Sequence, residues 1–258
     1  MSKLYTLSDQ ITIGLDAVFD DLAKSYEICS RLDMKPSSCR LTMQDPEGSV
    51  LEAAAADAYL GFDWVINNGE AQPLFTGTVK SAKDTEPETV RIVGYDAYRK
   101  LLTEKITVTL QRQTPDRMIR TLIVEKLGIA EVDIDECPTE IVRLPLYRTT
   151  AHEAIRQLHQ QLDAVYDCYV NETGVFVWKV RNYAQEAAYE FELGFDCDEF
   201  DQTNKTFLTE GVALKLGQVV GLIDHQDTYH TLFIVGLDRF DFGAGAQIKV
   251  YFVEVPSE

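Results

Sequence analysis

The stretch LFTGTVKSAKDTEPETVRIVGYDAYRKLLTEKI, residues 74–106, decides how the first part of this 258-residue chain folds. Residues 74–80 and 89–94 have the composition of β-strands, and the polar residues 81–88 between them indicate the tip of a hairpin. The second strand runs into an amphipathic segment, so we expect a helix from about residue 96 to residue 105. No group of residues suited to catalysis lies in this stretch, and we interpret it as structural.

The sequence before this hairpin predicts further strands. Residues 26–32 and 37–45 favour strands, and residues 62–66 alternate ahead of Asn68-Gly69, a strong signal for a tight hairpin turn. The alanine run within residues 49–61 is compatible with a helix, which Gly61 would end early. The first hundred residues are therefore expected to be mostly β.

After residue 106 the pattern becomes helical. Thr114 is the expected N-cap of one helix, and Pro115 its first residue. A second helix is predicted from Thr150, because Glu153 three residues later completes a capping-box pattern. A two-stranded hairpin follows this helix, so residues 107–182 predict a small α+β module.

The last part of the chain again predicts strands. Residues 183–202 are rich in carboxylates, and a β-meander follows from residue 212, with turns at 224–229 and 243–245. This spacing suggests a small barrel or sandwich. Both β-rich parts end in two long strands around a polar turn, which suggests that they share a fold.

The charge of the chain is strongly acidic, because 24 Lys and Arg stand against 42 Asp and Glu, a net charge of −18. This argues against tight binding to nucleic acid or to an anionic membrane, since both depend on basic side chains. Solubility is the simpler explanation of the charge, and a surface that lets nucleic acid pass without sticking is the alternative. No apolar run could span a bilayer, and the start lacks the apolar core of a signal peptide. We expect a soluble protein made in the cytoplasm, with no membrane insertion.

The five cysteines are odd in number, widely spaced and free of any C-x-x-C pair. Cys29 and Cys39 could face each other across a hairpin, but the pattern as a whole favours reduced, buried thiols over disulfides or a zinc site.

The best candidate for a metal site is a predicted turn that holds His225 and His230 with Asp224 and Asp227. Two imidazoles and a carboxylate are typical zinc ligands, but a site needs at least three ligands that converge. A polar turn explains these residues equally well, so we expect no metal, with His225, His230 and Asp227 as the weak candidates.

Other polar clusters give no better site. The carboxylates of residues 196–202 lack the glycine and the glutamate that a calcium loop of the EF-hand type requires. His152 and His159 lie on one face of the second predicted helix, where we expect them to be exposed. No motif of a hydrolase, a nucleotide-binding protein or a zinc protease is present. We therefore expect no catalytic residue and no cofactor.

Seven residues of the opening stretch follow the pattern F-x-G-x-V … V-x-I-x-x-x-D-x-x-x-x-L: Phe75, Gly77, Val79, Val90, Ile92, Asp96 and Leu101. This pattern resembles that of baseplate hub proteins of tailed phages and contractile injection systems, and of the hub part of type VI secretion spike proteins. The helix of residues 114–129, the helix and hairpin of residues 147–180 and the strands of residues 214–252 are similar to later segments of the family, in the same order. The first seventy residues match poorly.

The resemblance implies an α+β, mainly β fold in which two small tube-type β-barrels are separated by an α+β module. The expected boundaries are 1–106, 107–182 and 183–258. The seven pattern residues would then be structural residues of the first barrel and its helix. Lys83, Asp84 and Glu86 at the hairpin tip would be candidate contacts with a neighbouring ring or subunit.

The resemblance also implies a function without catalysis. Three copies would form a homotrimeric, pseudo-sixfold ring that adapts a hexameric tail tube to a central spike, with a lumen through which DNA or effectors pass. The implied partners are the tail tube protein, the spike protein and other baseplate proteins, with the tape measure protein as a further candidate. The expected location is the virion tail or baseplate, or an injection particle.

Two other classes of function stay open at this point. One is a β protein of the tail tip that binds a receptor or a carbohydrate. The other is a metal-dependent hydrolase built on the turn with His225 and His230.

Overall fold

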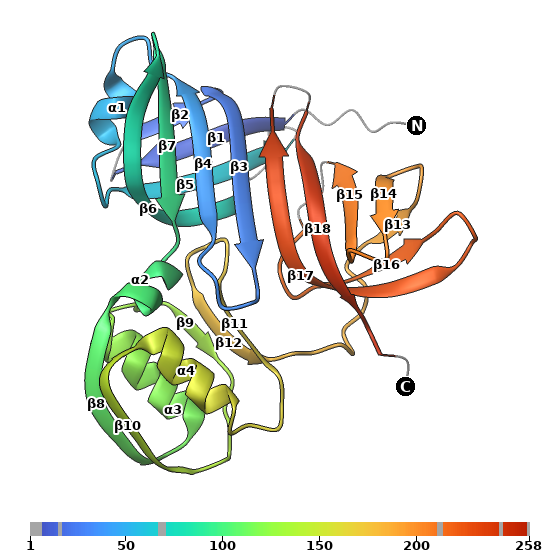
Figure 1. Ribbon diagram of the computed structural model, residues 1–258. Coiled ribbons are helices and arrows are strands. Elements are labelled where there is room, and N and C mark those ends of the chain that lie inside the picture. Colours follow the sequence, from blue (N-terminus) through green and yellow to red (C-terminus); the bar gives the residue numbers. More distant parts are fainter. Residues whose placement is uncertain (1–6, 15–16, 67–70, 211–213, 243–244, 257–258) are drawn as a thin grey trace.

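The computed structural model of the chain describes residues 7–14, 17–66, 71–210, 214–242 and 245–256. Two β units lie side by side, and a smaller α+β module lies below them in Figure 1. The predicted turn at Asn68-Gly69 lies outside the described residues, as does part of the predicted turn at 243–245. In the part of the chain that the structure describes, no helix is long and apolar enough to cross a membrane.

Seven antiparallel strands form the first β unit, in the spatial order β2-β1-β5-β6-β7-β4-β3. They are β1 (Leu7–Ile13), β2 (Ala17–Asp20), β3 (Ala23–Arg31), β4 (Ser38–Gln44), β5 (Tyr59–Ile66), β6 (Ala71–Glu86) and β7 (Thr89–Tyr95), with α1 (Ser49–Ala53) between β4 and β5.

The two end strands of this order, β2 and β3, are joined in the chain by residues 21–22 alone. The N–H of Asp21 donates to Asp9 O in β1, and the N–H of Gln44 in β4 donates to Leu22 O. The connection is thus bonded to both sides of the sheet, and the sheet must curl until its two edges approach each other.

Six strands form the second β unit, in the order β13-β16-β17-β18-β15-β14. They are β13 (Glu190–Glu192), β14 (Cys197–Asp201), β15 (Thr206–Glu210), β16 (Val219–Ile223), β17 (Tyr229–Asp241) and β18 (Gln247–Glu254). The end strands β13 and β14 are again neighbours in the chain, and an isolated bridge pairs Leu193 with Cys197 between them. In both units, therefore, a short connection between the two end strands makes the sheet curl.

One strand pair joins the two β units. β17 pairs antiparallel with β3, from Gly236 opposite Arg31 to Asp241 opposite Tyr26. The result is one 13-stranded sheet with one continuous hydrophobic core. The expected α+β, mainly β fold is confirmed. Strand pairing among the described residues does not define a closed barrel, and the boundaries 1–106, 107–182 and 183–258 stay a prediction.

The α+β module has its own core and lies at the lower end of the molecule in Figure 1. β8 and β10 form a two-stranded antiparallel ribbon beside α3 and α4, and β11-β12-β9 form a small sheet. The elements are α2 (Tyr98–Thr103), β8 (Lys105–Gln113), α3 (Pro115–Arg120), a π-helix η1 (Thr121–Lys126), β9 (Val132–Ile134), β10 (Ile141–Thr150), α4 (Ala151–His159), β11 (Tyr166–Val170) and β12 (Phe176–Val180).

Two helix starts predicted from local sequence signals, at Thr150 and Pro115, are present in the structure. Thr150 forms the predicted capping box: its hydroxyl accepts from the N–H of Glu153, whose carboxylate accepts from the N–H of Thr150. Pro115 is the first residue of α3 as predicted, but the Thr114 side chain makes no capping hydrogen bond.

Two expectations about the opening stretch are wrong. The polar residues 81–88 are not a loop, because β6 continues to Glu86 and the turn is confined to Pro87 and Glu88. The predicted helix 96–105 is shorter, because β8 begins at Lys105 and pairs with β10. The alanine-rich segment does contain a short helix, α1, but the helix ends at Ala53.

The cysteines are free thiols, as the sequence favoured. Cys39 pairs with Ile28, and Cys29 pairs with Ser38, so the two thiols occupy successive positions that face opposite sides of the sheet. This register explains why Cys39 is buried while Cys29 is half-buried.

Candidate functional site

The hairpin of β6 and β7 contains the residues of the F-x-G-x-V pattern. Residues 71–78 of β6 pair with β5, and residues 78–86 pair with β7, so the strand changes partner near Gly77. A Cβ at Gly77 would lie 2.4 Å from the carbonyl oxygen of Tyr95, which leaves room for glycine alone. Phe75 and Val79 on either side of it are buried in the core.

The partner strand β7 supplies the rest of the wall. Val90 and Ile92 alternate with more exposed positions and are buried in the same core as Phe75. The spacing of the pattern residues therefore follows from strand alternation, because every second side chain of β6 and β7 faces the core. Glycine stands where the backbones of the two strands approach each other closely.

Asp96 connects the first β unit to the α+β module. Its carboxylate accepts hydrogen bonds from the N–H of Ser37 at 2.8 Å and from the N–H of Tyr98 at 3.0 Å. Burial raises the pKa of Asp96 to about 7 despite these donors. Leu101, one turn further on, is buried in the core of the module with Tyr98.

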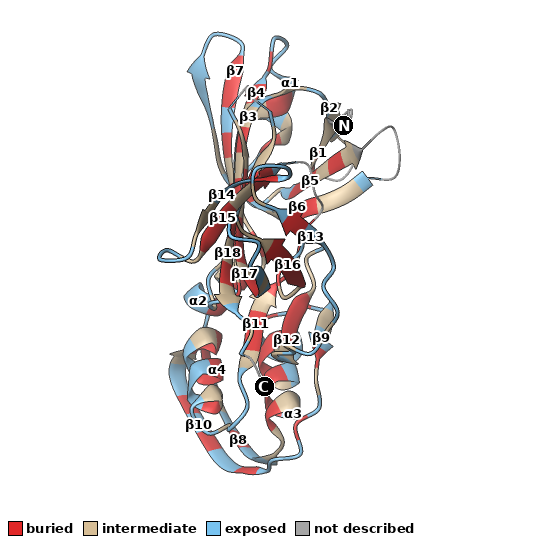
Figure 2. Cartoon of the chain, turned by 90° about the vertical axis from the view of Figure 1, so that its right-hand side faces the viewer, coloured by how far each residue is buried: buried red, intermediate tan, exposed pale blue. Residues whose placement is uncertain are grey.

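The tip of the hairpin is exposed at residues 83–88, which form the pale blue end of β6 and the turn after it in Figure 2. Lys83, Asp84 and Glu86 pair with Arg91, Val90 and Thr89, with a bulge between Asp84 and Glu86. These side chains therefore stand on a two-stranded ribbon that projects from the unit.

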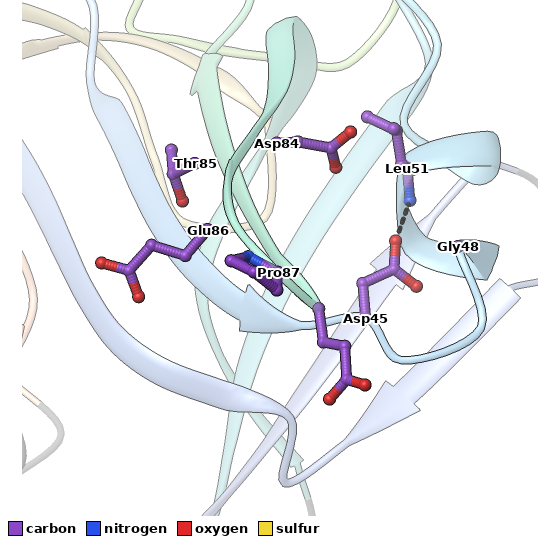
Figure 3. A pocket seen from close by; sticks show the side chains of 8 residues that line it. Asp45, Gly48, Leu51, Asp84, Thr85, Glu86 and Pro87 are labelled. Carbon is purple, nitrogen blue, oxygen red and sulfur yellow. Dashed lines mark hydrogen bonds between the residues drawn. The ribbon is translucent and has the colours of Figure 1, made fainter.

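A pocket of about 460 Å³ lies beside the tip (Figure 3). Asp45 at its base is buried, and its carboxylate accepts from the N–H groups of Val50 and Leu51 at the start of α1. Asp84, Glu86 and Glu88 complete a lining that has four carboxylates and no cation. The hairpin tip thus presents an acidic recess to whatever approaches it.

A buried ion pair attaches the module to the second β unit. Arg239 of β17 is fully buried and donates through Nη2 to Leu214 O at 2.7 Å and to Glu172 Oε1 at 3.3 Å. Glu172 lies in the turn between β11 and β12. Burial lowers the pKa of Arg239, and its Nε and Nη1 have no hydrogen-bond partner among the described residues. Sequence reasoning missed this pair.

A second ion pair lies where β3 meets β17. Arg31 Nη1 lies 2.6 Å from Asp238 Oδ1, and Tyr251 of β18 donates to Asp238 Oδ2 at 2.8 Å. The guanidinium of Arg31 also lies over the Tyr251 ring at 4.1 Å. These contacts span three strands at the junction of the two β units and hold it in register.

The candidate metal turn is organised by Asp224. Its Oδ1 accepts from the N–H groups of Gln226 and Thr228, and its Oδ2 lies 3.0 Å from His230 Nε2. The hydrogen bond with His230 lowers the pKa of Asp224 most, followed by that from Thr228. His225 and Asp227 lie in the turn itself. Among the described residues, no three His, Cys, Asp or Glu side chains are arranged so that they could hold a metal ion.

The expectation that His152 and His159 are exposed is wrong. His159 Nε2 accepts from the indole N–H of Trp178 at 2.8 Å, and His152 Nδ1 lies 3.3 Å from the hydroxyl of Tyr98. Neither imidazole is fully exposed, and burial lowers the pKa of each. They serve as polar partners for aromatic side chains of the module core.

The negative charge is concentrated in the last part of the chain. Residues 183–258 contain fourteen of the 42 acidic residues and four of the 24 basic ones. Glu190, Glu192, Asp198 and Glu199 on β13 and β14 are exposed. These carboxylates are therefore available to water or to a partner.

Solved structures of phage tail proteins and of a type VI secretion component share the fold of this chain. The prophage MuSo2 43 kDa tail protein from Shewanella oneidensis shares it with a TM-score of 0.75 and 14% identity, over 98% of this chain and 100% of that one. The tail protein from Neisseria meningitidis MC58 gives a TM-score of 0.76 and 12% identity, over 95% and 96%.

A third structure comes from a secretion system. An E. coli type VI secretion component, described as structurally similar to the T4 tail proteins gp27 and gp5, gives a TM-score of 0.66 and 10% identity, over 96% of this chain and 77% of that one. No family model matches the sequence, and no curated protein matches it. The resemblance seen in the sequence is confirmed at the level of the fold.

Proposed function

We propose that this chain is a structural hub protein of a phage tail or a related injection particle, and that it acts without catalysis. The observation that supports this most is the fold itself, which extends over 98% of this chain and all of a prophage tail protein. The likeness includes both β units and the module between them.

The two β units give this proposal its geometry. Each unit curls by a two- to four-residue connection between its end strands, and the β3–β17 pair fixes the units edge to edge. Three copies would supply six such units, enough for a pseudo-sixfold ring that meets a hexameric tail tube on one side and a spike on the other. Most oligomers of identical chains are closed, symmetric assemblies.

The negative net charge of the chain supports a lumen through which DNA or effectors pass. Carboxylates on an inner wall repel phosphates, and at about 0.15 M salt the repulsion extends roughly 8 Å from the surface. The tail tube, spike and other baseplate proteins would be the partners, and the virion tail the location. Lys83, Asp84 and Glu86 would contact the neighbouring ring from the hairpin tip.

Mass photometry and sedimentation velocity over a range of protein concentrations test the proposal. The expected result is a species of three times the 29.1 kDa chain mass, with a ring in electron micrographs. A protein that stays monomeric at the highest concentration, alone and with the tail tube protein, would contradict it. Binding on a glycan array without self-association would favour a receptor-binding protein instead.

A further inference from the structure

The two-stranded ribbon of β8 and β10 differs in composition from the rest of the chain. Its nineteen residues, 105–113 and 141–150, include four cations and no Asp or Glu. Acidic residues make up 42 of 258 positions, about one in six, so nineteen residues would ordinarily include about three. The cations are Lys105, Arg112, Arg143 and Arg148.

One face of the ribbon is covered and the other is open. Ile106, Leu110, Leu144 and Leu146 point into the module core and are buried. The register pairs Arg143 with Gln111 and Pro145 with Thr109, and all four of these residues are exposed. Alternation along both strands therefore places Lys105 and Arg143 on the outer face. Arg112 has the same parity as the buried Leu110, and Arg148 lies where the register shifts; both are nevertheless exposed.

No salt bridge holds the ribbon cations in the part of the chain that the structure describes, although the pKa of the Glu153 carboxyl, which the hydrogen bonds from Thr150 lower most, is lowered further by the nearby Lys105. None of the four makes an ion pair or a side-chain hydrogen bond there, although carboxylates outnumber cations in the protein. Tyr147 between them is 78% exposed, and Val142 is 74% exposed. An exposed aromatic flanked by unpaired arginines is typical of interface surfaces.

A complementary surface lies on the opposite side of the molecule. Glu192 of β13 and Asp198 and Glu199 of β14 are exposed, and their carboxylates have no ion-pair or hydrogen-bond partner among the described residues. Figure 1 shows the ribbon at the left of the module and β13 and β14 at the right of the second β unit. The two surfaces therefore cannot meet within one chain.

We propose that the outer face of the β8–β10 ribbon binds the acidic β13–β14 surface of a second copy of this chain. Unpaired charges of opposite sign attract in this arrangement, and contact between two different surfaces of identical chains can close into a ring. The inference rests on the proposed function, because it names the surfaces through which the copies of the ring meet.

Charge reversal tests the inference. In Arg143→Glu/Arg148→Glu the ribbon would repel the acidic surface, so self-association should weaken at least tenfold, measured by sedimentation equilibrium in low salt. Arg117→Glu/Arg120→Glu makes the same charge change on exposed residues of α3, outside the ribbon, and should leave association within about twofold of the wild type. Circular dichroism and melting temperature confirm that each variant folds.

A second pair of substitutions shows whether the two surfaces meet. Adding Asp198→Lys/Glu199→Lys to the ribbon variant restores opposite charges and should recover most of the lost affinity. If the Arg143→Glu/Arg148→Glu variant forms the same oligomer as the wild type, the inference is overturned while the proposed ring stands. A wild-type protein that never self-associates would overturn both. If the Arg143→Glu/Arg148→Glu variant loses binding to DNA or to another tail protein while its self-association is intact, the inference is also overturned.

Discussion

Arg239 and Glu172 form a buried ion pair between β17 and the turn that joins β11 to β12, with Nη2 3.3 Å from Oε1. The pair links the second β unit to the α+β module. Because Arg239 is fully buried, its charge depends on Glu172 and on Leu214 O for compensation.

Glu172→Ala is therefore expected to destabilise the protein by about 3–5 kcal/mol, the usual cost of leaving a buried charge unpaired. Urea denaturation measures this free energy of unfolding. The matched control is Glu131→Ala, an exposed glutamate of the same module, which should change stability by less than about 0.5 kcal/mol. Arg239→Met/Glu172→Gln removes the charge from both sides and should cost less than Glu172→Ala alone. Equal losses in Glu172→Ala and Glu131→Ala would show that the pair contributes nothing.

Gly77→Ala is expected to destabilise the first β unit by about 3 kcal/mol, the upper end of the cost of overpacking. The added Cβ would lie 2.4 Å from a backbone oxygen of Tyr95, which cannot move without breaking the strand pair. At Gly61 the nearest atom belongs to the side chain of Tyr59, 42% exposed and free to rotate, so Gly61→Ala serves as the control and should cost less. Thermal unfolding of both variants checks the order. A larger loss at Gly61 would contradict the explanation.

Asp96 gives the stability a defined pH dependence. Its pKa is about 7 in the folded state against 3.8 in the unfolded chain, so the folded state holds the proton more tightly. The contribution of this group is then full below pH 3.8 and is lost as pH rises through about 7. A tenfold difference in proton affinity between the two states corresponds to about 1.4 kcal/mol of stability.

In Asp96→Asn this pH dependence should vanish. The measurement is the free energy of unfolding in urea from mildly acidic to mildly alkaline pH, on both sides of the folded-state pKa, for the wild type and the variant. We expect the wild type to lose stability relative to the variant as pH rises. Parallel curves for the two proteins would show that Asp96 does not titrate in this range.

The hairpin tip is expected to affect assembly and not folding. Reversing the charges of Lys83, Asp84 and Glu86 together should change the free energy of unfolding by no more than about 1 kcal/mol, because all three are exposed. Binding to the tail tube protein, measured by biolayer interferometry, should weaken at least tenfold. Reversal of Lys80, an exposed cation of β6 away from the tip, is the control. Unchanged binding by the tip variant would exclude the tip as a ring contact.

The sequence predicted well those elements that rest on local chemistry. The capping box at Thr150, the start of α3 at Pro115 and the alternation of Val90 and Ile92 are all local patterns, and the structure has each of them. Gly77 belonged to a recognised pattern, but the reason for glycine there is the distant carbonyl of Tyr95.

Tertiary pairing explains what the sequence did not predict. β8 carries an alternating strand pattern in Ile106, Val108 and Leu110, which the predictions from sequence did not include, and its partner β10 lies some thirty residues later. Arg239 gave one usable signal, since it stands two positions after the buried Leu237 and therefore on the inward face of β17. Its partner Glu172 lies in a polar turn of another module, and nothing in a single sequence joins the two positions.

Pairing of β3 with β17 has a consequence for synthesis. Arg31 and Gly236 are opposite each other although they are about 200 residues apart, so β3 leaves the ribosome long before its neighbour exists. Until β17 is made, β3 is an open edge on which other chains can add strands. Such long-range pairing also slows folding. We therefore expect truncated chains that end before residue 229 to aggregate, and the yield of native protein to depend on chaperones that cover this edge.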